Sequence, residues 1–216
     1  MSQRTPARRA ARGGAAAGLL AGAVVGYALA VRAEPDAGAA EAELRQRFGG
    51  EYRFIGGAPE RASVPAAVEH SVDGMFFISR GIAYERLLRS CEICSSYVLR
   101  FTPTQVVVSG PCQLADISPA DGGEVEHRTK HDETSQLSQR FVDGALVQEF
   151  RGEGGSRRVV WRLDPDGETL HVQMVISSHH LPRPVDYTLT YRRKGGAAAA
   201  PGGNDGGQDA GPGPPG

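Results

Sequence analysis

Apolar and polar residues alternate along most of the second half of the chain. Residues 156–163, SRRVVWRL, and 168–177, ETLHVQMVIS, alternate with a period of two, and Asp166-Gly167 lies between them. Such alternation is typical of β-strands with one buried face, and Asp-Gly is a favoured hairpin turn. The pattern predicts nine strands after residue 94: 95–101, 104–110, 111–117, 123–130, 133–141, 145–152, 156–163, 168–177 and 184–193.

The first half of the chain carries two other patterns. Residues 48–57, FGGEYRFIGG, predict one short strand between glycine turns. Residues 59–90 instead repeat apolar side chains at helical spacing, which predicts two helices that break near Gly74. Large antiparallel sheets usually curl closed or split into layers, because open edges invite aggregation. We therefore expect a mainly β fold: a closed antiparallel β-barrel of about ten strands, with a two-helix lid segment after the first strand.

The two ends of the chain differ from the part between them. Residues 15–31 are an uncharged, largely apolar run behind an arginine-rich start, so 1–33 is predicted to be a signal peptide. If it is not cleaved, the run 15–31 would attach the protein to a membrane, although its length is at the lower limit for spanning a bilayer. We expect 34–46 to be a linker, 47–193 a single barrel domain, and 194–216, rich in Gly, Ala and Pro, a disordered tail.

Charge and motifs narrow the classes of function. With the five arginines of the first 33 residues and Lys194 set aside, residues 34–193 carry 18 Arg and Lys against 23 Asp and Glu. The resulting net charge near −5 argues against a nucleic-acid partner. The acidic residues are spread over turns and are expected to be solvated. The sequence has no nucleophile elbow, phosphate loop or His-Glu-x-x-His, so we expect neither an enzyme nor a cofactor.

The order of one strand, a helical pair and a meander of short strands resembles the intracellular fatty-acid-binding proteins, a branch of the calycins related to lipocalins. The segment 146–167, LVQEFRGEGGSRRVVWRLDPDG, with ETLHVQM behind it, is similar to that family's strands and turns near the C-terminus. The resemblance implies that the helices form a lid and that the barrel interior holds a fatty acid or a similar ligand.

In that family, two interior arginines and a tyrosine hold the ligand's carboxylate. Counted back from the Asp-Gly turn, Arg162 stands in the place of one arginine and Tyr191 in that of the tyrosine, but Leu189 replaces the second arginine. Strand parity argues against a ligand role for Arg162, because an inward Arg162 would turn the bulky Trp161 outward. The alternative is an exposed Arg162 above an inward Trp161.

The same resemblance gives the other candidate ligand contacts. Gln148 is expected to orient the ligand, and the apolar contacts are expected from Phe150 in the wall and from Met75, Phe77 and Ile82 in the lid. Tyr191 is expected to face inward, either as wall packing or as a ligand contact. The apolar residues of the lid form a wrap wider than one helix face needs, so the lid could instead plug the barrel.

The cysteines and histidines offer alternatives. Cys91 and Cys94 have the spacing of a reducible dithiol or of two zinc ligands, but neither a parallel α/β unit nor a full ligand set is evident. In an exported protein the preferred explanation is a structural disulfide that joins Cys112 to Cys91 or Cys94. The histidines, among them His127, are expected on the surface, and no metal site is expected.

Together these patterns predict an exported carrier or sensor that binds a hydrophobic or amphipathic small molecule or lipid. We expect it to be periplasmic or extracellular, or alternatively anchored to the membrane. The alternative is an envelope structural or partner-binding protein whose barrel is packed solid. A thiol oxidoreductase that uses Cys91 and Cys94 is the least favoured function. A hollow barrel interior would favour the carrier or sensor, and a filled interior would favour the structural or partner-binding protein.

Overall fold

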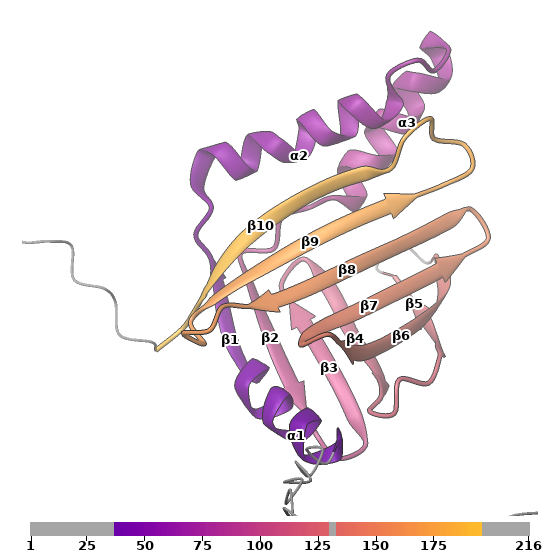
Figure 1. The fold of residues 1–216 in the computed structure, drawn as a ribbon. Helices are drawn as coiled ribbons and strands as arrows, with labels where there is room; N and C mark the ends of the chain where they lie inside the picture. Colours follow the sequence, from indigo (N-terminus) through magenta and orange to yellow (C-terminus); the bar gives the residue numbers. More distant parts are fainter. Residues whose placement is uncertain (1–36, 130–132, 196–216) are drawn as a thin grey trace, which may run out of the picture. The chain divides into compact units, whose positions relative to one another are not determined.

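The structure of the protein, a computed structural model, describes residues 37–129 and 133–195 (Figure 1). The predicted signal or anchor, 1–33, lies outside the described residues, as do residues 196–216 of the predicted tail. The elements, in chain order, are α1 Ala37–Phe48, β1 Gly50–Phe54, α2 Gly57–Val72, α3 Phe77–Ser90, β2 Ser96–Phe101, β3 Gln105–Gly110, β4 Gln113–Pro119, β5 Val125–Arg128, β6 Thr134–Val142, β7 Ala145–Gly152, β8 Gly155–Leu163, β9 Thr169–Ser177 and β10 Val185–Arg193.

The strands form one antiparallel sheet in the order β4-β3-β2-β1-β10-β9-β8-β7-β6-β5. The sheet curls until its end strands, β4 and β5, lie beside each other, although no backbone ladder joins them in the described residues (Figure 1). The predicted ten-stranded barrel with two helices after the first strand is confirmed, and its closure is almost complete. We call the line between β4 and β5 the seam.

Strand alternation decides which side chains fill the interior. In β8, Val159 and Trp161 are buried, whereas Arg158 and Arg162 are exposed. The turn between β6 and β7 fits this arrangement, because Asp143 and Gly144 have φ values of 51° and 76°. Positive φ at both central residues gives a type I′ turn, whose twist matches that of the strands it joins.

Helix α1 occupies most of the segment that we expected to be a linker. Phe48, at its end, is buried and packs edge-to-face on Phe141 at 5.3 Å between ring centroids. Arg45 donates to the carbonyl oxygen of Ala120 at 2.7 Å and pairs with Glu41 at 2.6 Å. Residues 37–46 of the predicted linker are therefore part of a helix, since Ala, Glu, Leu and Arg are strong helix formers, and Leu44, Arg45 and Phe48 hold this helix to the domain.

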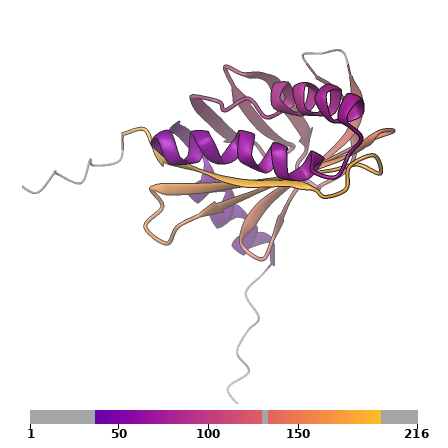
Figure 2. The same cartoon turned by 90° about the horizontal axis from the view of Figure 1, so that it is seen from above.

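Helices α2 and α3 pack differently. Helix α2 lies along β10 (Figure 1), buries Val64, Val68 and Val72, and is fixed there because the Glu60 carboxylate accepts from the Thr190 backbone N–H at 2.6 Å. Helix α3 turns back from the end of α2 (Figure 2) and has no buried residue. No helix of the described segments is long and apolar enough to cross a membrane. Helix α3 is thus the less deeply packed of the two lid helices, held to the core by the partly buried Tyr84, Leu87 and Leu88.

The interior is filled at the end near α1. Tyr52, Tyr191 and Leu146 have no exposed surface there, and Trp161 is only 2% exposed. Tyr97 packs edge-to-face on Trp161, with ring centroids 4.9 Å apart. This aromatic layer forms a floor, so any space for a ligand lies between the floor and α3.

Candidate functional site

A hollow of about 540 Å³ lies beneath α3, at the end of the barrel opposite the aromatic floor. Helix α3 contributes Ala83 and Leu87 to its roof, and strands β7 to β9 contribute Phe150 and Ile176 to its walls. Thr129 and Glu133, near β5 and β6, and the turns after β7 and β9 form the remaining rim. The hollow is therefore roofed by the least tightly packed helix of the domain.

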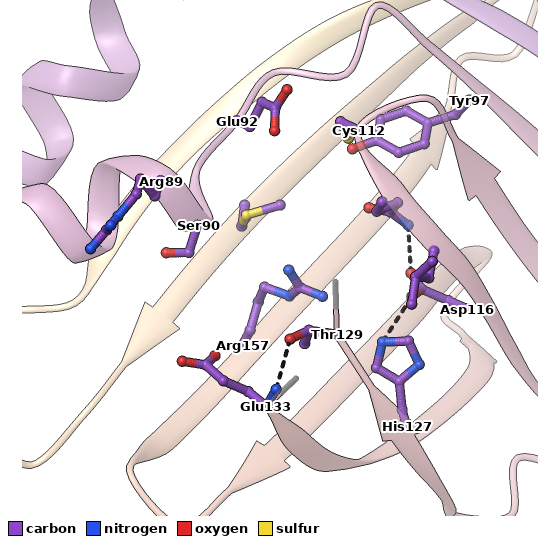
Figure 3. Close-up of a pocket in the computed structure, with 13 residues that line it drawn as sticks. Arg89, Ser90, Glu92, Tyr97, Cys112, Asp116, His127, Thr129, Glu133 and Arg157 are labelled. Atoms are coloured by element: carbon purple, nitrogen blue, oxygen red, sulfur yellow. Dashed lines mark hydrogen bonds and ion pairs between the residues drawn. The ribbon is translucent and has the colours of Figure 1, made fainter. Parts of the chain in front are cut away.

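A second, smaller hollow of about 100 Å³ lies beside the seam (Figure 3). Asp116 on β4 and His127 on β5 line it from the two sides of the seam, and Tyr97 lines it from β2. Ser90, Thr129, Glu133 and Arg157 line both hollows, so the two spaces meet at these residues.

Of the four residues that line both hollows, Arg157, on β8, carries the positive charge; Figure 3 shows it among the residues that line the smaller hollow. It shares the inward face of β8 with Val159 and Trp161 and is half-buried. Its guanidinium carbon lies 4.0 Å from the centre of the Phe150 ring. Among the described residues it forms no hydrogen bond and no ion pair, and its buried Nε has no partner. Such a cation is an open position for an anion.

A network of polar side chains surrounds Asp116 at the seam. Its carboxylate accepts hydrogen bonds from Gln113 Nε2 at 2.7 Å and from Gln148 Nε2 at 3.4 Å. His127 Nε2 lies 3.3 Å from the other carboxylate oxygen. Gln139, on β6, donates to the backbone carbonyl oxygens of Asp116 and Val106. These contacts join β4 to β5, β6 and β7 where the backbone ladder is missing.

The network extends to the chain's single tryptophan. Trp161 Nε1 donates to Gln148 Oε1 at 2.7 Å, and Gln148 donates in turn to Gln139 Oε1 at 2.8 Å. The orientation of the Gln148 amide is fixed by this chain, since its oxygen accepts and its nitrogen donates. Trp161 is therefore connected to Asp116 through one side chain and can report on its state.

Burial dominates the electrostatics of this region. It raises the pKa of Asp116 from 3.8 to about 6, although the Arg157 cation and the amide donors lower it. Burial, followed by the field of Arg157, lowers the pKa of His127. Burial also raises the pKa of Tyr97 to about 12 and raises the pKa of Tyr187. Asp116 thus changes charge in a range where most carboxyl groups are already ionised.

The structure places the predicted clamp residues away from a common site. Arg162 is exposed on the outer face of β8, where its guanidinium donates to Gln173 at 3.4 Å. Arg162 therefore does not reach the interior. The parity argument, which placed Trp161 inward and Arg162 outward on this strand, gives the orientation that the structure has. Tyr191 faces inward but belongs to the floor, where its hydroxyl donates to the carbonyl oxygen of Cys94 at 3.1 Å. It lines neither hollow.

The other candidate contacts divide into two groups. Phe150 and Met75 line the larger hollow, and their role as ligand contacts stays a prediction. Gln148 is buried within the polar network and lines neither hollow. Phe77 and Ile82, expected on the inner side of the lid, are 72% and 60% exposed. The apolar residues of α3 lie on more than one face of the helix. Ala83 and Leu87 lie on the face that packs inward.

The cysteines form the expected structural bridge. Cys94 is joined to Cys112, which ties the start of β2 to the β3–β4 turn. Cys91 is a buried free thiol at the end of α3, and burial raises its pKa. Cys91 and Cys94 are thus not a dithiol pair, which removes the basis for the oxidoreductase alternative. In the part of the chain that the structure describes, no group of three metal-ligating side chains is found.

Three residues of the candidate site were not identified from the sequence: Arg157, His127 and Asp116. Arg157 could have been found from parity alone, because it lies four residues before Trp161 and shares its face. His127 and Asp116 were expected to be solvated, and this expectation was wrong: their side chains are 9% and 3% exposed. Both side chains point across the seam, and no pattern in the sequence marks where a barrel is left open.

The order of its elements makes the described domain a β-barrel of the fatty-acid-binding-protein-like kind, with a helical lid over an interior that is open at one end. No protein-family model matches the chain, and no curated protein matches it. Similar solved structures include the REP1-NXSQ fatty acid transporter, with 11% identity, 69% of this chain and 97% of that chain covered, and a TM-score of 0.41.

Two further solved structures have similar values. Caenorhabditis elegans lipid binding protein 8 is 8% identical, with 69% of this chain and 96% of that chain covered and a TM-score of 0.45. Echinococcus granulosus fatty-acid-binding protein 1 is 10% identical, with 68% and 98% covered and a TM-score of 0.43.

Proposed function

We propose that the protein is an exported carrier or sensor that binds a hydrophobic or amphipathic small molecule. An anionic group of the ligand would lie at Arg157. The observation that carries this proposal is the half-buried guanidinium of Arg157, which forms no ion pair or hydrogen bond among the described residues although it lies where the two hollows meet. Removing a charge from water is unfavourable unless a partner compensates for it, and an anionic ligand would be that partner.

The surroundings of Arg157 support an amphipathic ligand. The larger hollow, of about 540 Å³, falls within the usual range of roughly 300 to 1,000 Å³ for small-molecule sites. Its apolar lining comes from Met75, Ala83, Leu87, Phe150, Ile176 and Leu181. Two buried side-chain atoms of the described residues have no hydrogen-bond partner, Ser135 Oγ and Arg157 Nε, and both residues line this hollow. A polar head group beside them and an apolar tail beneath α3 would use both kinds of surface.

Export is supported by two features of the chain. The apolar run 15–31 behind an arginine-rich start has the composition of a signal. The bond between Cys94 and Cys112 suits an oxidising compartment. The intact mass of the protein recovered from the exported fraction tests this part: loss of about the first 33 residues supports cleavage, the full mass supports an anchor, and a purely cytoplasmic protein contradicts both.

Binding by the full chain to two matched amphiphiles tests the ligand site. Dodecane-1-sulfonate carries a permanent anion and 1-dodecanol carries none. We expect Arg157→Gln to weaken sulfonate binding by about 10- to 100-fold, since a hydrogen bond to a charged group contributes about 1.5–3 kcal/mol. Dodecanol binding should change little.

Arg162→Gln is the matched control, because it removes the same charge from the outer face of the same strand. Sulfonate binding that survives Arg157→Gln unchanged, or that Arg162→Gln weakens equally, would refute the assignment to Arg157.

A second function has one observation in its favour. The end of the barrel near α1 is packed, with Tyr52, Leu146 and Tyr191 fully buried, and a solid barrel would act through its outer surface as a structural or partner-binding protein. A wild-type chain that purifies without a small molecule and binds neither amphiphile would favour this alternative.

A further inference from the structure

A buried carboxylate lies close to the proposed anion position. Asp116 is 2% exposed and lines the smaller hollow together with Arg157. The two form no ion pair, yet the Arg157 cation lowers the pKa of the Asp116 carboxyl through space. An anionic ligand at Arg157 would therefore enter a poorly solvated region that already holds a negative charge.

We propose that Asp116, which lines the smaller hollow together with Arg157, takes up a proton when an anionic head group binds at Arg157. The inference rests on the proposed function, since it concerns the same site. Its consequence is a site that loads its ligand in acidic surroundings and releases it as the pH rises.

The groups around Asp116 determine the direction of the effect. Arg157 is the cation that stabilises the Asp116 anion, and a ligand anion beside Arg157 cancels that stabilisation. His127 follows the same direction, because the field of Arg157 lowers its pKa and the ligand would relieve that field. The groups that face Asp116 from the packed elements are Gln113 on β4, His127 on β5, Gln139 on β6, Gln148 on β7, Arg157 on β8 and Tyr97 on β2.

Two more acids and one more arginine border the smaller hollow. Glu92 and Glu133 line it, as does Arg89 at the end of α3. The carboxylate of Glu133 lies 3.8 Å from the Arg86 guanidinium, and Glu133 is exposed to solvent. Asp116 is thus the carboxyl that burial separates from water, and it is the one whose proton the ligand would control.

Thermodynamic linkage gives the size of the effect. In the free protein Asp116 has a pKa of about 6, and ligand binding raises it. Below pH 6 the carboxyl is protonated in both states, so affinity is constant. Above pH 6 binding requires proton uptake, and affinity falls by up to tenfold per pH unit until the pKa of the complex is reached.

Calorimetric titration of the full chain with dodecane-1-sulfonate from pH 5.5 to 8 tests the proposal, since the sulfonate does not titrate there. Running each titration in two buffers with different ionisation heats counts the protons taken up. We expect affinity to fall at least tenfold between pH 6 and 8, with proton uptake approaching one per ligand. Uncharged 1-dodecanol should bind without proton uptake.

Asp116→Asn should remove most of this dependence and bind the sulfonate at pH 8 nearly as tightly as the wild type does at pH 5.5. Adding His127→Gln should remove the remainder. Wild-type binding that is independent of pH and takes up no proton would overturn this inference while leaving the proposed function intact. Binding of neither amphiphile at any pH would overturn the proposed function itself. If Asp116→Asn does not fold, the two-buffer measurement on the wild type decides alone.

Discussion

The burial of Asp116 makes a prediction about folding as well as binding. Its carboxyl has a pKa of about 6 in the folded protein against 3.8 as the reference for the unfolded chain. The folded state therefore holds this proton more tightly. The stability that the neutral carboxyl contributes is fully present below pH 3.8 and is lost as the pH rises towards 6, which amounts to about 3 kcal/mol in all.

Asp116→Asn removes this titration. We expect the free energy of unfolding of the variant, relative to the wild type, to increase by about 2 kcal/mol between pH 4.5 and 7.5. Gln113 and Gln148 donate to the same carboxylate oxygen, so the Asn amide oxygen can accept both hydrogen bonds while its nitrogen faces His127 Nε2, and any remaining penalty does not vary with pH. Urea unfolding followed by Trp161 fluorescence measures both proteins, and their difference cancels the other titrating groups.

Asp166→Asn serves as the control of opposite sign. Asp166 is fully exposed, and hydrogen bonds from the backbone N–H groups of Glu168 and Thr169 lower its pKa. Its contribution is thus present at neutral pH and lost in acid, so the stability of this variant relative to the wild type should fall as the pH rises. A difference for Asp116→Asn that stays constant from pH 4.5 to 7.5 would refute the raised pKa.

Two further predictions concern the scaffold. The double variant Cys94→Ala/Cys112→Ala should lower the free energy of unfolding in urea by about 3 kcal/mol, because the bridge closes a loop with a sequence separation of 18. Cys91→Ala, which removes no cross-link, should lower it clearly less. Equal losses in the two variants would contradict this account. Phe48→Ala should lose about 3–5 kcal/mol, because Phe48 is 2% exposed, whereas unchanged stability would show that α1 does not belong to the folded domain.

The architecture was largely predictable because its signal repeats. Period-two alternation and turns such as Asp143-Gly144 recur along the chain, so an error in one strand would not have changed the fold class. The lid helices were predictable for the same reason. Which face of α3 turns inward was not, because Phe77 and Ile82 are as apolar as Leu87, and only the position of the barrel rim selects among them.

The site was less predictable because it depends on local exceptions. On β4 the rule that apolar residues face inward would bury Ile117 and expose Asp116, but Ile117 is 46% exposed and Asp116 is buried. The register of β3 and β4 shifts between Val108 and Gly110, so alternation cannot be counted through that strand. On β8, by contrast, no shift occurs, and the parity of Trp161 sufficed to exclude Arg162 and to indicate Arg157.

The seam means that the circumference of this barrel is not fixed by its backbone. Between β4 and β5 the wall is held by side chains, chiefly the contacts of Asp116 with His127 and of Gln139 with the β3 and β4 carbonyl oxygens. The wall can widen there by exchanging these few contacts for water while every β-ladder remains intact. The circumference at the seam is therefore set by a handful of buried polar side chains rather than by backbone hydrogen bonds.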